Sequence, residues 1–485
     1  MVTSQSVPLP TPGDAIRQGL AWTVTQLPID QLPSEPVLGL GALGVASAVV
    51  GGRIAVGHGI HYVARSAAGR EGYALPMSVR NHRKVGQLER HGNALSIPRT
   101  GSILALGASR SGKTEAAKHI VDQMRADESE PMIVYDHKND YQDFLEGRGT
   151  PFDRLSPRDA DVAWNVFREI ETDQDADEIA RAIFASAGED TYFDVAGRQV
   201  FAAMLSYLRK EGEHSGDSPT NGDLVGFLQE TDRETVYECL CEYDELTGAA
   251  SHLDPDSSRQ ASGVYASVQR QINDTFVGDF AKDGQFSIRE YMNDPQGRAL
   301  VLDYPYREGA TTTPLFRLLI DLAAREALDE GDRGSYFILD EIAQVPTLSR
   351  LDELVNVGAG RGIQVLVTLQ SVAQLREGYG RDAAEAILSG FLSAILLRCG
   401  DSATVEFARE RIGTNHVERT ANVEKATVGS RGRRRQKTIR RETKDSEEYR
   451  FAKGDLTEWS PGEGVVVRPD SWAHGRLKML DEGGS

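Results

Sequence analysis

The sequence has few cysteines and few lysines, and it lacks a net positive charge. Three cysteines in 485 residues give neither a disulfide framework nor a zinc-site spacing, so a reducing compartment is expected. The formal net charge of −19 excludes a chain that holds nucleic acid over its whole surface, so any DNA contact must be confined to a loop or a pore. Only 11 of the 54 basic residues are lysine. A salt-adapted surface and a GC-rich genome would each explain this bias.

We expect no cleavable signal peptide, because residues 1–20 lack a basic start followed by an apolar stretch. A charge-free apolar run, PVLGLGALGVASAVVGG, occupies residues 36–52, and Arg53 interrupts it. Its 17 residues are about the minimum for a membrane helix, and basic residues gather after it. We therefore expect an N-terminal extension over residues 1–35 and a transmembrane segment over residues 36–64, with the rest of the chain in the cytoplasm. A buried, glycine-rich segment of a soluble domain is the alternative.

The clearest motif lies between an apolar run and a helix-forming segment. Ile103–Leu106 is typical of a buried parallel strand, and the residues from Glu115 onward favour a helix. Between them, GASRSGKT fits the phosphate-binding pattern G-x-x-x-x-G-K-[ST]. The residues of this P-loop are Gly107, Ala108, Ser109, Arg110, Ser111, Gly112, Lys113 and Thr114. We expect its backbone N–H groups to hold the phosphates of ATP, Lys113 to reach the β- and γ-phosphates, and the Thr114 hydroxyl to bind Mg²⁺. An ordinary glycine turn is the alternative.

A P-loop needs a second strand that ends in carboxylates. Residues 335–341, SYFILDE, provide an apolar strand followed by Asp340 and Glu341. We expect Asp340 to orient the magnesium ion through water and Glu341 to polarise the attacking water. The only close rival is the run that ends in Asp303, where a single acid stands alone. The adjacent acids therefore predict the hydrolytic pair, and the plain start of a loop is the alternative.

A further apolar run, IQVLVTL over residues 363–369, ends in Gln370. A polar residue at the end of the strand beside the P-loop can contact the γ-phosphate and report its loss. We therefore include Gln370 among the candidate catalytic residues. A simple cap at the end of the strand is the alternative.

These segments together resemble the coupling proteins of type IV secretion, the TraG/TraD-type relatives of the FtsK and HerA DNA translocases. The most specific stretch is LDEIAQVPTLSRLDELVNVGAGRGIQVLVTLQSVAQLREGYG, Leu339–Gly380. IVYDHKNDY at Ile133–Tyr141 is similar to the Asp-x-Lys strand end of that family, and WNVFREI near Trp164 is a third match. FSIREYM near Phe286 is a weaker one. The resemblance covers about two-thirds of the chain.

The resemblance implies a RecA-like α/β P-loop NTPase domain with an inserted all-helical domain and an N-terminal membrane anchor. The expected divisions are NTPase segments at 90–154 and 286–415, a helical insertion at 155–285, a basic flexible loop at 416–450, and a C-terminal strand and tail at 451–485. The resemblance also implies a homo-hexameric ATPase at the cell membrane that moves DNA and works with a relaxase and secretion-channel components. A salt-adapted archaeon would fit the scarcity of lysine.

In these relatives an arginine from the neighbouring subunit completes the site. The basic residue that they carry two or three positions before the glycine corresponding to Gly362 is missing here, where Ala359 and Gly360 stand. Arg361 is therefore our candidate for the arginine finger, and a surface arginine is the alternative.

A dense basic run, RGRRRQKTIRR at Arg431–Arg441, stands out in the acidic chain. Its polar flanks predict a flexible loop that contacts DNA phosphates or anionic lipid, or that is simply solvated. Three valines within residues 463–468 predict an edge strand that rejoins the sheet.

Two other functions fit the motifs: a soluble FtsK- or HerA-like ATPase for DNA processing or packaging, and an ATP-binding receptor for secreted proteins.

Overall fold

The structure is a computed structural model. It describes residues 82–87, 94–98, 101–125, 129–184, 191–304, 309–329, 334–344, 347–427, 436–469 and 471–477. The predicted N-terminal extension (1–35) and transmembrane segment (36–64) lie outside the described residues. Within those ranges, we find no helix with both the length and the apolar character that a membrane span requires.

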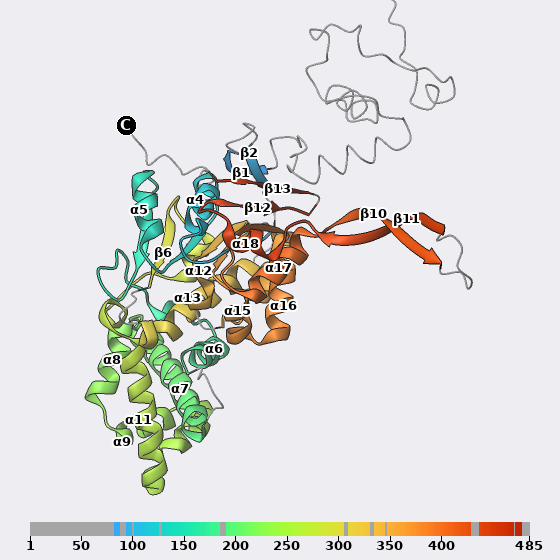
Figure 1. The fold of residues 1–485 in the computed structure, drawn as a ribbon. Coiled ribbons are helices and arrows are strands. Elements are labelled where there is room, and N and C mark those ends of the chain that lie inside the picture. The colour runs from blue at the N-terminus through green and yellow to red at the C-terminus, as the bar shows by residue number, and fades with distance from the viewer. Residues whose placement is uncertain are drawn as a thin grey trace, which may run out of the picture. The chain divides into compact units, whose positions relative to one another are not determined.

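A nine-stranded sheet in the order β13-β12-β9-β3-β8-β7-β4-β6-β5 carries the fold (Figure 1). The strands from β9 to β5 run parallel to one another. They are β3 (Ile103–Leu106), β4 (Met132–Asp136), β5 (Phe152–Leu155), β6 (Ala299–Asp303), β7 (Ser335–Leu339), β8 (Ile363–Leu369) and β9 (Ser393–Leu397). Most of their residues are buried, as expected for parallel strands covered on both faces. The strands predicted at residues 103–106 and 363–369 are confirmed.

Two antiparallel strands complete one side of the sheet. β12 (Glu463–Val467) pairs with β9, and β13 (Trp472–Arg476) pairs with β12. The three valines therefore rejoin the sheet as predicted, but the prediction of an edge strand was wrong because β13 lies outside β12. A separate pair, β1 (His82–Gln87) and β2 (Ala94–Pro98), is also antiparallel.

Alternate residues of the strands pack into two hydrophobic clusters, one on each face of the sheet, as the pleat requires. On β3, Ile103 and Ala105 join the cluster that includes α4 and α5. Leu104 and Leu106 join the other cluster, which extends through α13, α15, α16 and α17. The bounds of these helices are α4 (Lys113–Met124), α5 (Asp140–Gly147), α13 (Gly309–Asp329), α15 (Val372–Tyr379), α16 (Arg381–Gly390) and α17 (Ser402–Ile412).

Between the neighbouring strands β5 and β6 the chain forms a set of helices, drawn in green to yellow-green (Figure 1). They include the short helix η4 (Val166–Glu169), α6 (Asp173–Ile183), α7 (Tyr192–Ser215), α8 (Asn221–Glu230), α9 (Arg233–Cys241), α10 (Thr247–Ala250), α11 (Ser258–Thr275) and α12 (Ile288–Asn293). Threonine caps with reciprocal aspartate bonds begin α6, α7 and α8, which explains why these helices start where they do. All of these helices except α12 lie within residues 155–285.

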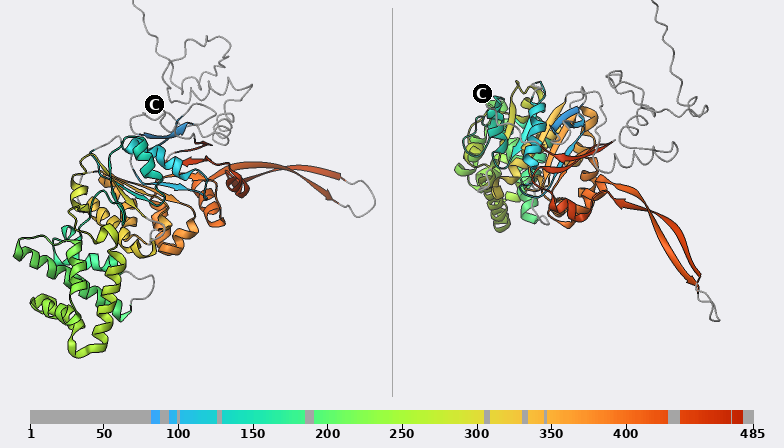
Figure 2. Two further views of the ribbon diagram at one scale, coloured as in Figure 1. Left: turned by 90° about the vertical axis from the view of Figure 1, so that its left-hand side faces the viewer. Right: turned by 45° about the horizontal axis from the view of Figure 1, so that its top comes forward.

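Strands β10 (Thr414–Thr427) and β11 (Gln436–Tyr449) form a two-stranded antiparallel hairpin outside the main sheet (Figure 2). The flexible loop predicted at 416–450 was therefore wrong for most of its length, although residues 428–435 lie outside the described part. The prediction failed because these polar, charged strands lack the alternating apolar residues that mark a half-buried strand.

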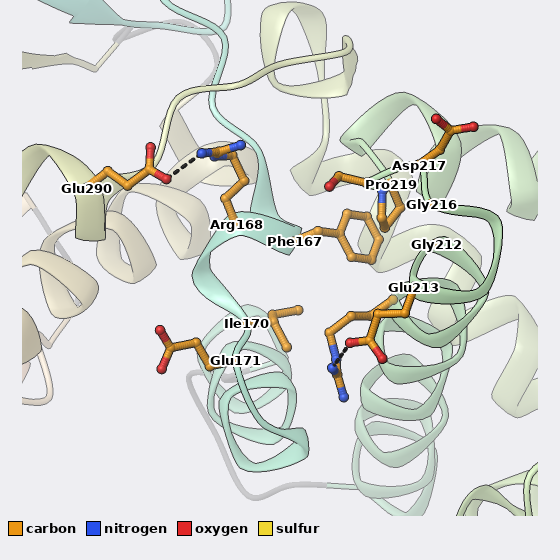
Figure 3. Close-up of a pocket in the computed structure, with 12 residues that line it drawn as sticks. Phe167, Arg168, Ile170, Glu171, Gly212, Glu213, Gly216, Asp217, Pro219 and Glu290 are labelled. Atoms are coloured by element: carbon orange, nitrogen blue, oxygen red, sulfur yellow. Dashed lines mark hydrogen bonds and ion pairs between the residues drawn. The ribbon is translucent and has the colours of Figure 1, made fainter.

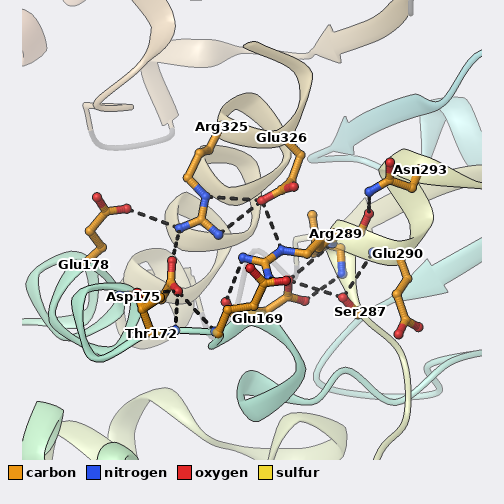
Figure 4. Close-up of polar contacts among 12 residues, drawn as sticks. Glu169, Thr172, Asp175, Glu178, Ser287, Arg289, Glu290, Asn293, Arg325 and Glu326 are labelled. Atoms are coloured by element: carbon orange, nitrogen blue, oxygen red, sulfur yellow. Dashed lines mark hydrogen bonds and ion pairs between the residues drawn. The ribbon is translucent and has the colours of Figure 1, made fainter. Parts of the chain in front are cut away.

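A buried carboxylate, Glu169 at the end of η4, fastens the start of the helical insertion to its end (Figure 4). It accepts hydrogen bonds from Trp164 Nε1 at 2.9 Å, from Ile288 N at 2.7 Å and from Arg289 N at 3.2 Å. Burial raises the pKa of Glu169, and these hydrogen bonds oppose the shift. The bonds satisfy a group that would otherwise be costly to bury.

Arg325, only 8% exposed, links α13 to the insertion (Figure 4). Its guanidinium donates to Asp175 at 3.0 Å and to Glu178 at 3.3 Å, both on α6, and to Glu326 at 3.1 Å on its own helix. A planar guanidinium can serve several carboxylates at once, so one residue holds two helices that belong to different parts of the chain.

Candidate nucleotide-binding site

The predicted P-loop lies at the carboxyl edge of the parallel strands, where open α/β sheets bind ligands. Gly107 N donates to Leu369 O at the end of β8, at 3.1 Å. Ala108 N donates to Arg398 O, directly after β9, at 2.7 Å. The start of the loop is therefore held by both strands that flank β3.

Two glycines of the loop are required by space and by backbone conformation. A Cβ on Gly107 would lie 2.7 Å from Ser111 Oγ and 2.9 Å from Leu397 Cβ. Gly112 has a φ of +104°, which favours glycine, and a Cβ there would lie 3.2 Å from Gly462 N. Ser111 Oγ is buried and has no hydrogen-bond partner among the described residues. The loop therefore presents a tight backbone cradle with an unused buried hydroxyl.

Lys113 is buried at the start of α4. Its Nζ donates to Gly107 O at 2.8 Å and to Ala108 O at 3.3 Å, and lies 3.7 Å from Glu341 Oε1. Burial lowers the pKa of Lys113, while Glu341 and Asp340 act in the opposite direction. The ammonium group is therefore held between the loop carbonyls and the acid pair.

The amino end of α4 points into the loop. Gly112 occupies the N-cap position, and no side chain of the described residues caps the helix. The first backbone N–H groups are thus left for an anion, and the helix dipole favours one. Thr114, the second helical residue, is half-buried, whereas Ser109 and Arg110 at the loop tip are exposed.

Asp340 and Glu341 follow β7 directly, as predicted, and Thr368 of β8 connects them. Thr368 Oγ1 donates to Asp340 Oδ1 at 2.7 Å and accepts from Glu341 N at 2.8 Å. Asp340 Oδ2 is buried without a hydrogen-bond partner among the described residues. Burial raises the pKa of Asp340 to about 6, and the bond from Thr368 opposes this shift. In the sequence, the only signal for Thr368 is its place two residues before Gln370.

Glu341 is 8% exposed and has a φ of +49°, a left-handed conformation that a glutamate rarely adopts. Besides Lys113, its Oε1 meets Lys138 Nζ at 3.4 Å. Non-glycine residues in this conformation are concentrated at functional sites because the surrounding structure must impose it. The backbone bond to Thr368 is one such constraint.

Lys138 belongs to the Asp-x-Lys segment that the sequence analysis singled out. The buried Asp136 at the end of β4 accepts from Lys138 N at 3.2 Å, and from Tyr141 N and Gln142 N at 3.0 Å each. Burial raises the pKa of Asp136, whereas these backbone bonds lower it. Asp136 thus fixes the turn into α5 and places Lys138 beside the acid pair.

The structure places Gln370 beside the P-loop and Arg361 far from it. Gln370 follows Leu369, whose carbonyl binds the first residue of the loop. Arg361 is exposed and precedes the amino end of β8, and the seven residues of that strand span roughly 23 Å. Arg361 therefore cannot reach the P-loop of its own chain. Its role toward a neighbouring subunit remains a prediction.

Arg398 is an arginine near the loop that the sequence analysis did not identify. Its Nη2 donates to Ser109 O at 3.4 Å. It directly follows β9, so its position depends on the order of strands in the sheet. The sequence offered no motif that would reveal it.

A separate surface pocket of about 530 Å³ lies between η4 and the carboxyl end of α7 (Figure 3). Both arginines that line it are engaged: Arg168 pairs with Glu290, and Arg209 pairs with Glu213. Further acids, Glu171 and Asp217, also line the pocket, which makes it unsuited to a nucleotide phosphate. The described residues offer their phosphate cradle at the P-loop instead.

The sheet, the loop and the acid pair define a P-loop nucleotide-binding protein of the α/β class. Residues 97–480 match the family model described as type IV secretion-system coupling protein DNA-binding domain. The chain therefore belongs to the type IV secretion-system coupling protein family.

Curated relatives agree with this assignment. The chain is 24% identical over 323 residues to coupling protein TraD of Escherichia coli strain K12, an alignment that covers 63% of this chain and 43% of TraD. It is 22% identical over 311 residues to a probable conjugal transfer protein TraG of Sinorhizobium fredii, with 59% of this chain and 47% of the relative covered. The chain thus spans less than half the length of these relatives.

Solved structures with this fold include the bacterial conjugative coupling protein TrwBΔN70, with a TM-score of 0.64, 20% identity, and coverage of 84% of this chain and 90% of that one. TrwB in complex with the ATP analogue ADPNP has a TM-score of 0.61 and 22% identity, with 78% and 86% covered. TrwB in complex with ADP and Mg²⁺ has a TM-score of 0.62 and 21% identity, with 82% and 89% covered. At such identities the likeness shows the fold.

Proposed function

We propose that this chain binds ATP and Mg²⁺ at the P-loop and hydrolyses ATP to drive DNA transfer as a coupling protein of conjugation-like type IV secretion. The observation that carries the proposal is the meeting of Lys113 with Glu341 beside the buried Asp340, at the carboxyl edge of the parallel sheet. Membership of the coupling protein family and the nucleotide complexes of TrwB support it.

The residues at the loop fit a nucleotide phosphate with its magnesium ion. The cradle leaves no space for a Cβ at Gly107, and both Ser111 Oγ and Asp340 Oδ2 are buried without partners among the described residues. The described residues contain no group of three or more His, Cys, Asp and Glu side chains that could hold a metal ion. Mg²⁺ in nucleotide sites takes one or two protein ligands and completes its shell with phosphate oxygens and water. Bound Mg²⁺ would neutralise charge on the phosphate oxygens.

Each candidate residue has a distinct task in this mechanism. Lys113 turns from the loop carbonyls to the β- and γ-phosphates, and the Thr114 hydroxyl and Asp340 hold the metal side of the site. Glu341 accepts a hydrogen bond from the attacking water and takes its proton. Gln370 contacts the γ-phosphate from the end of β8.

We further propose that the chain works as a homo-hexamer at the cell membrane, with its ATPase domain in the cytoplasm and a relaxase and secretion channel as partners. The distance of Arg361 from its own P-loop supports a ring, because only a neighbouring subunit could bring this arginine to the site. The apolar run at residues 36–52 supports the membrane anchor.

The β10–β11 hairpin is our candidate for a DNA contact. From Arg419 to Lys444 the sequence has ten basic and two acidic residues, a net charge of +8 in a chain of net charge −19. Arg419 and Lys444 occupy directly opposite positions in the ladder, so the basic residues are carried by both strands. A basic segment of this kind can neutralise DNA phosphates, and the release of counterions would favour the binding of DNA.

The decisive experiment compares ATP turnover and ATP binding in the full chain and in Glu341→Gln. We expect turnover to fall by about 10²- to 10⁴-fold, the usual contribution of a general base, while ATP affinity is retained. Unchanged turnover would remove Glu341 from the mechanism. A native chain that binds ATP with negligible turnover would favour the receptor for secreted proteins.

The same assay with single- and double-stranded DNA at several salt concentrations tests the substrate. We expect DNA to stimulate turnover, and the effect to weaken as salt rises. An ATP turnover rate that is the same with and without DNA at every salt concentration would refute the proposal of a DNA motor. Absence of the full chain from the membrane fraction would favour the soluble DNA-processing ATPase.

A further inference from the structure

Two ammonium groups share one oxygen of Glu341. Lys113 Nζ lies 3.7 Å and Lys138 Nζ lies 3.4 Å from Glu341 Oε1. Lys113 comes from the P-loop, whereas Lys138 comes from the end of β4, the strand that pairs with β7 on the side away from β8. The glutamate is therefore approached from both sides of its own strand.

The two lysines differ in what else they can do. The side chain of Lys113 is 6% exposed and is held by two loop carbonyls, and a P-loop lysine is needed at the phosphates once nucleotide binds. The side chain of Lys138 is 52% exposed, and Glu341 is the one acid for which the structure shows an ion pair with it among the described residues. When Lys113 moves to the phosphates, Lys138 is left as the partner of Glu341.

The turn that carries Lys138 is attached to the strand that returns from the helical insertion. Tyr304, directly after β6, donates its backbone N–H to Asp136 O at 3.1 Å. Its ring lies 5.6 Å from the ring of His137, and its hydroxyl lies 2.8 Å from Thr313 Oγ1 on α13. A shift of β6 or α13 would therefore move the backbone on which Lys138 sits.

We propose that Lys138 is a positioning residue that restrains Glu341 until movement of the β6 end withdraws its ammonium group. The ammonium group lies 3.4 Å from Glu341 Oε1 and so occupies an oxygen that must be free to accept a hydrogen bond and then the proton of the attacking water. The inference rests on the proposed ATP hydrolysis. It adds a path by which the helical insertion controls the rate.

Steady-state kinetics of the full chain test the restraint. In Lys138→Ala we expect the kcat without DNA to rise about fivefold and the KM for ATP to stay unchanged. A change of about fivefold corresponds to the upper end of the free energies measured for partly exposed ion pairs. Stimulation by DNA should fall by a similar factor. Lys138→Arg, which keeps the charge and the reach, should behave as the native chain. Lys118→Ala is the matched control, because Lys118 pairs with Glu115 on α4.

Three results would overturn the proposal: a lower kcat in Lys138→Ala, a kcat equal to that of the native chain, or equal behaviour of the alanine and arginine variants. The first would make Lys138 an aid to catalysis instead of a restraint. The third would show that the positive charge is not the cause.

A measurement without nucleotide separates this proposal from the proposed function. Acylation of lysines, read by mass spectrometry, should modify Lys138 about fivefold faster in Glu341→Gln than in the native chain, because loss of the carboxylate frees the amine. Lys282, which is 68% exposed and pairs with Asp279, is the internal reference. Unchanged labelling of Lys138 refutes the pair even if the chain hydrolyses ATP. Faster labelling in a chain without turnover supports the pair while the ATPase proposal fails.

Discussion

Asp340→Asn should stabilise the nucleotide-free protein while it weakens nucleotide binding. Burial raises the pKa of Asp340 from 3.8 to about 6, so the folded state binds the proton more tightly than the unfolded state does. Ionisation therefore opposes folding, by about 3 kcal/mol for a shift of about two units. The penalty is complete above about pH 6 and vanishes below about pH 4. Asparagine has nearly the same shape, carries no charge, and can still accept the bond from Thr368.

The assay is urea unfolding followed by tryptophan fluorescence, without nucleotide and with a chelator present. At pH near 8 we expect the free energy of unfolding to rise by up to about 3 kcal/mol in Asp340→Asn, and the gain to disappear near pH 4. Glu115→Gln, on the solvent side of α4, controls for loss of one acid and should change stability by less than about 0.5 kcal/mol. Affinity for ATP with Mg²⁺ should fall in Asp340→Asn only. A variant less stable than the native chain at pH 8, or a gain independent of pH, would refute the reasoning.

Three further predictions concern space, buried charge and DNA. Gly107→Ala should lower the free energy of unfolding by about 1–3 kcal/mol and weaken ATP binding, because the loop has no space for a Cβ there. Gly226→Ala, where a Cβ on α8 would meet no other atom, should raise the free energy of unfolding by up to about 1 kcal/mol. Urea unfolding measures both changes. Arg325→Ala should cost about 1–3 kcal/mol, because it removes a buried guanidinium that bridges partly buried acids on two helices. Arg376→Ala, at a more exposed pair, should cost less than about 1 kcal/mol. Arg440→Gln on the hairpin should reduce the slope of log DNA affinity against log salt concentration by about one unit, as measured by fluorescence anisotropy. An equal loss of binding to anionic vesicles would indicate a lipid contact instead.

The sequence was sufficient where local chemistry determines the structure. Binding a phosphate needs glycine, lysine and a hydroxyl at fixed offsets, so Gly107–Thr114 could be located without knowledge of the fold. A buried strand that ends in acids is also a local pattern, and Asp340 stands directly after β7 as expected. Apolar runs marked β3 and β8 to the residue.

The parts that could not be predicted are those created by the order of strands. Thr368 reaches the acid pair because β8 pairs with β7, and Lys138 reaches Glu341 across 203 residues of sequence because β4 pairs with the other side of β7. No local sequence pattern predicts that β7 lies between β8 and β4. The prediction for the hairpin failed for another reason: its sequence is rich in polar and charged residues, so the usual alternation of apolar residues that marks a strand is missing.

The position of Arg361 leads to a test of how the site is completed. All parallel strands bring their carboxyl ends to the P-loop edge, so a residue before β8 lies at the opposite edge and can serve only another subunit. Arg398, by contrast, already contacts the loop within its own chain. If Arg361 completes the site, turnover per subunit should rise with protein concentration in the native chain and in Arg398→Ala, and stay low in Arg361→Ala. If Arg398 completes it, turnover should not depend on concentration, and Arg398→Ala alone should lose it.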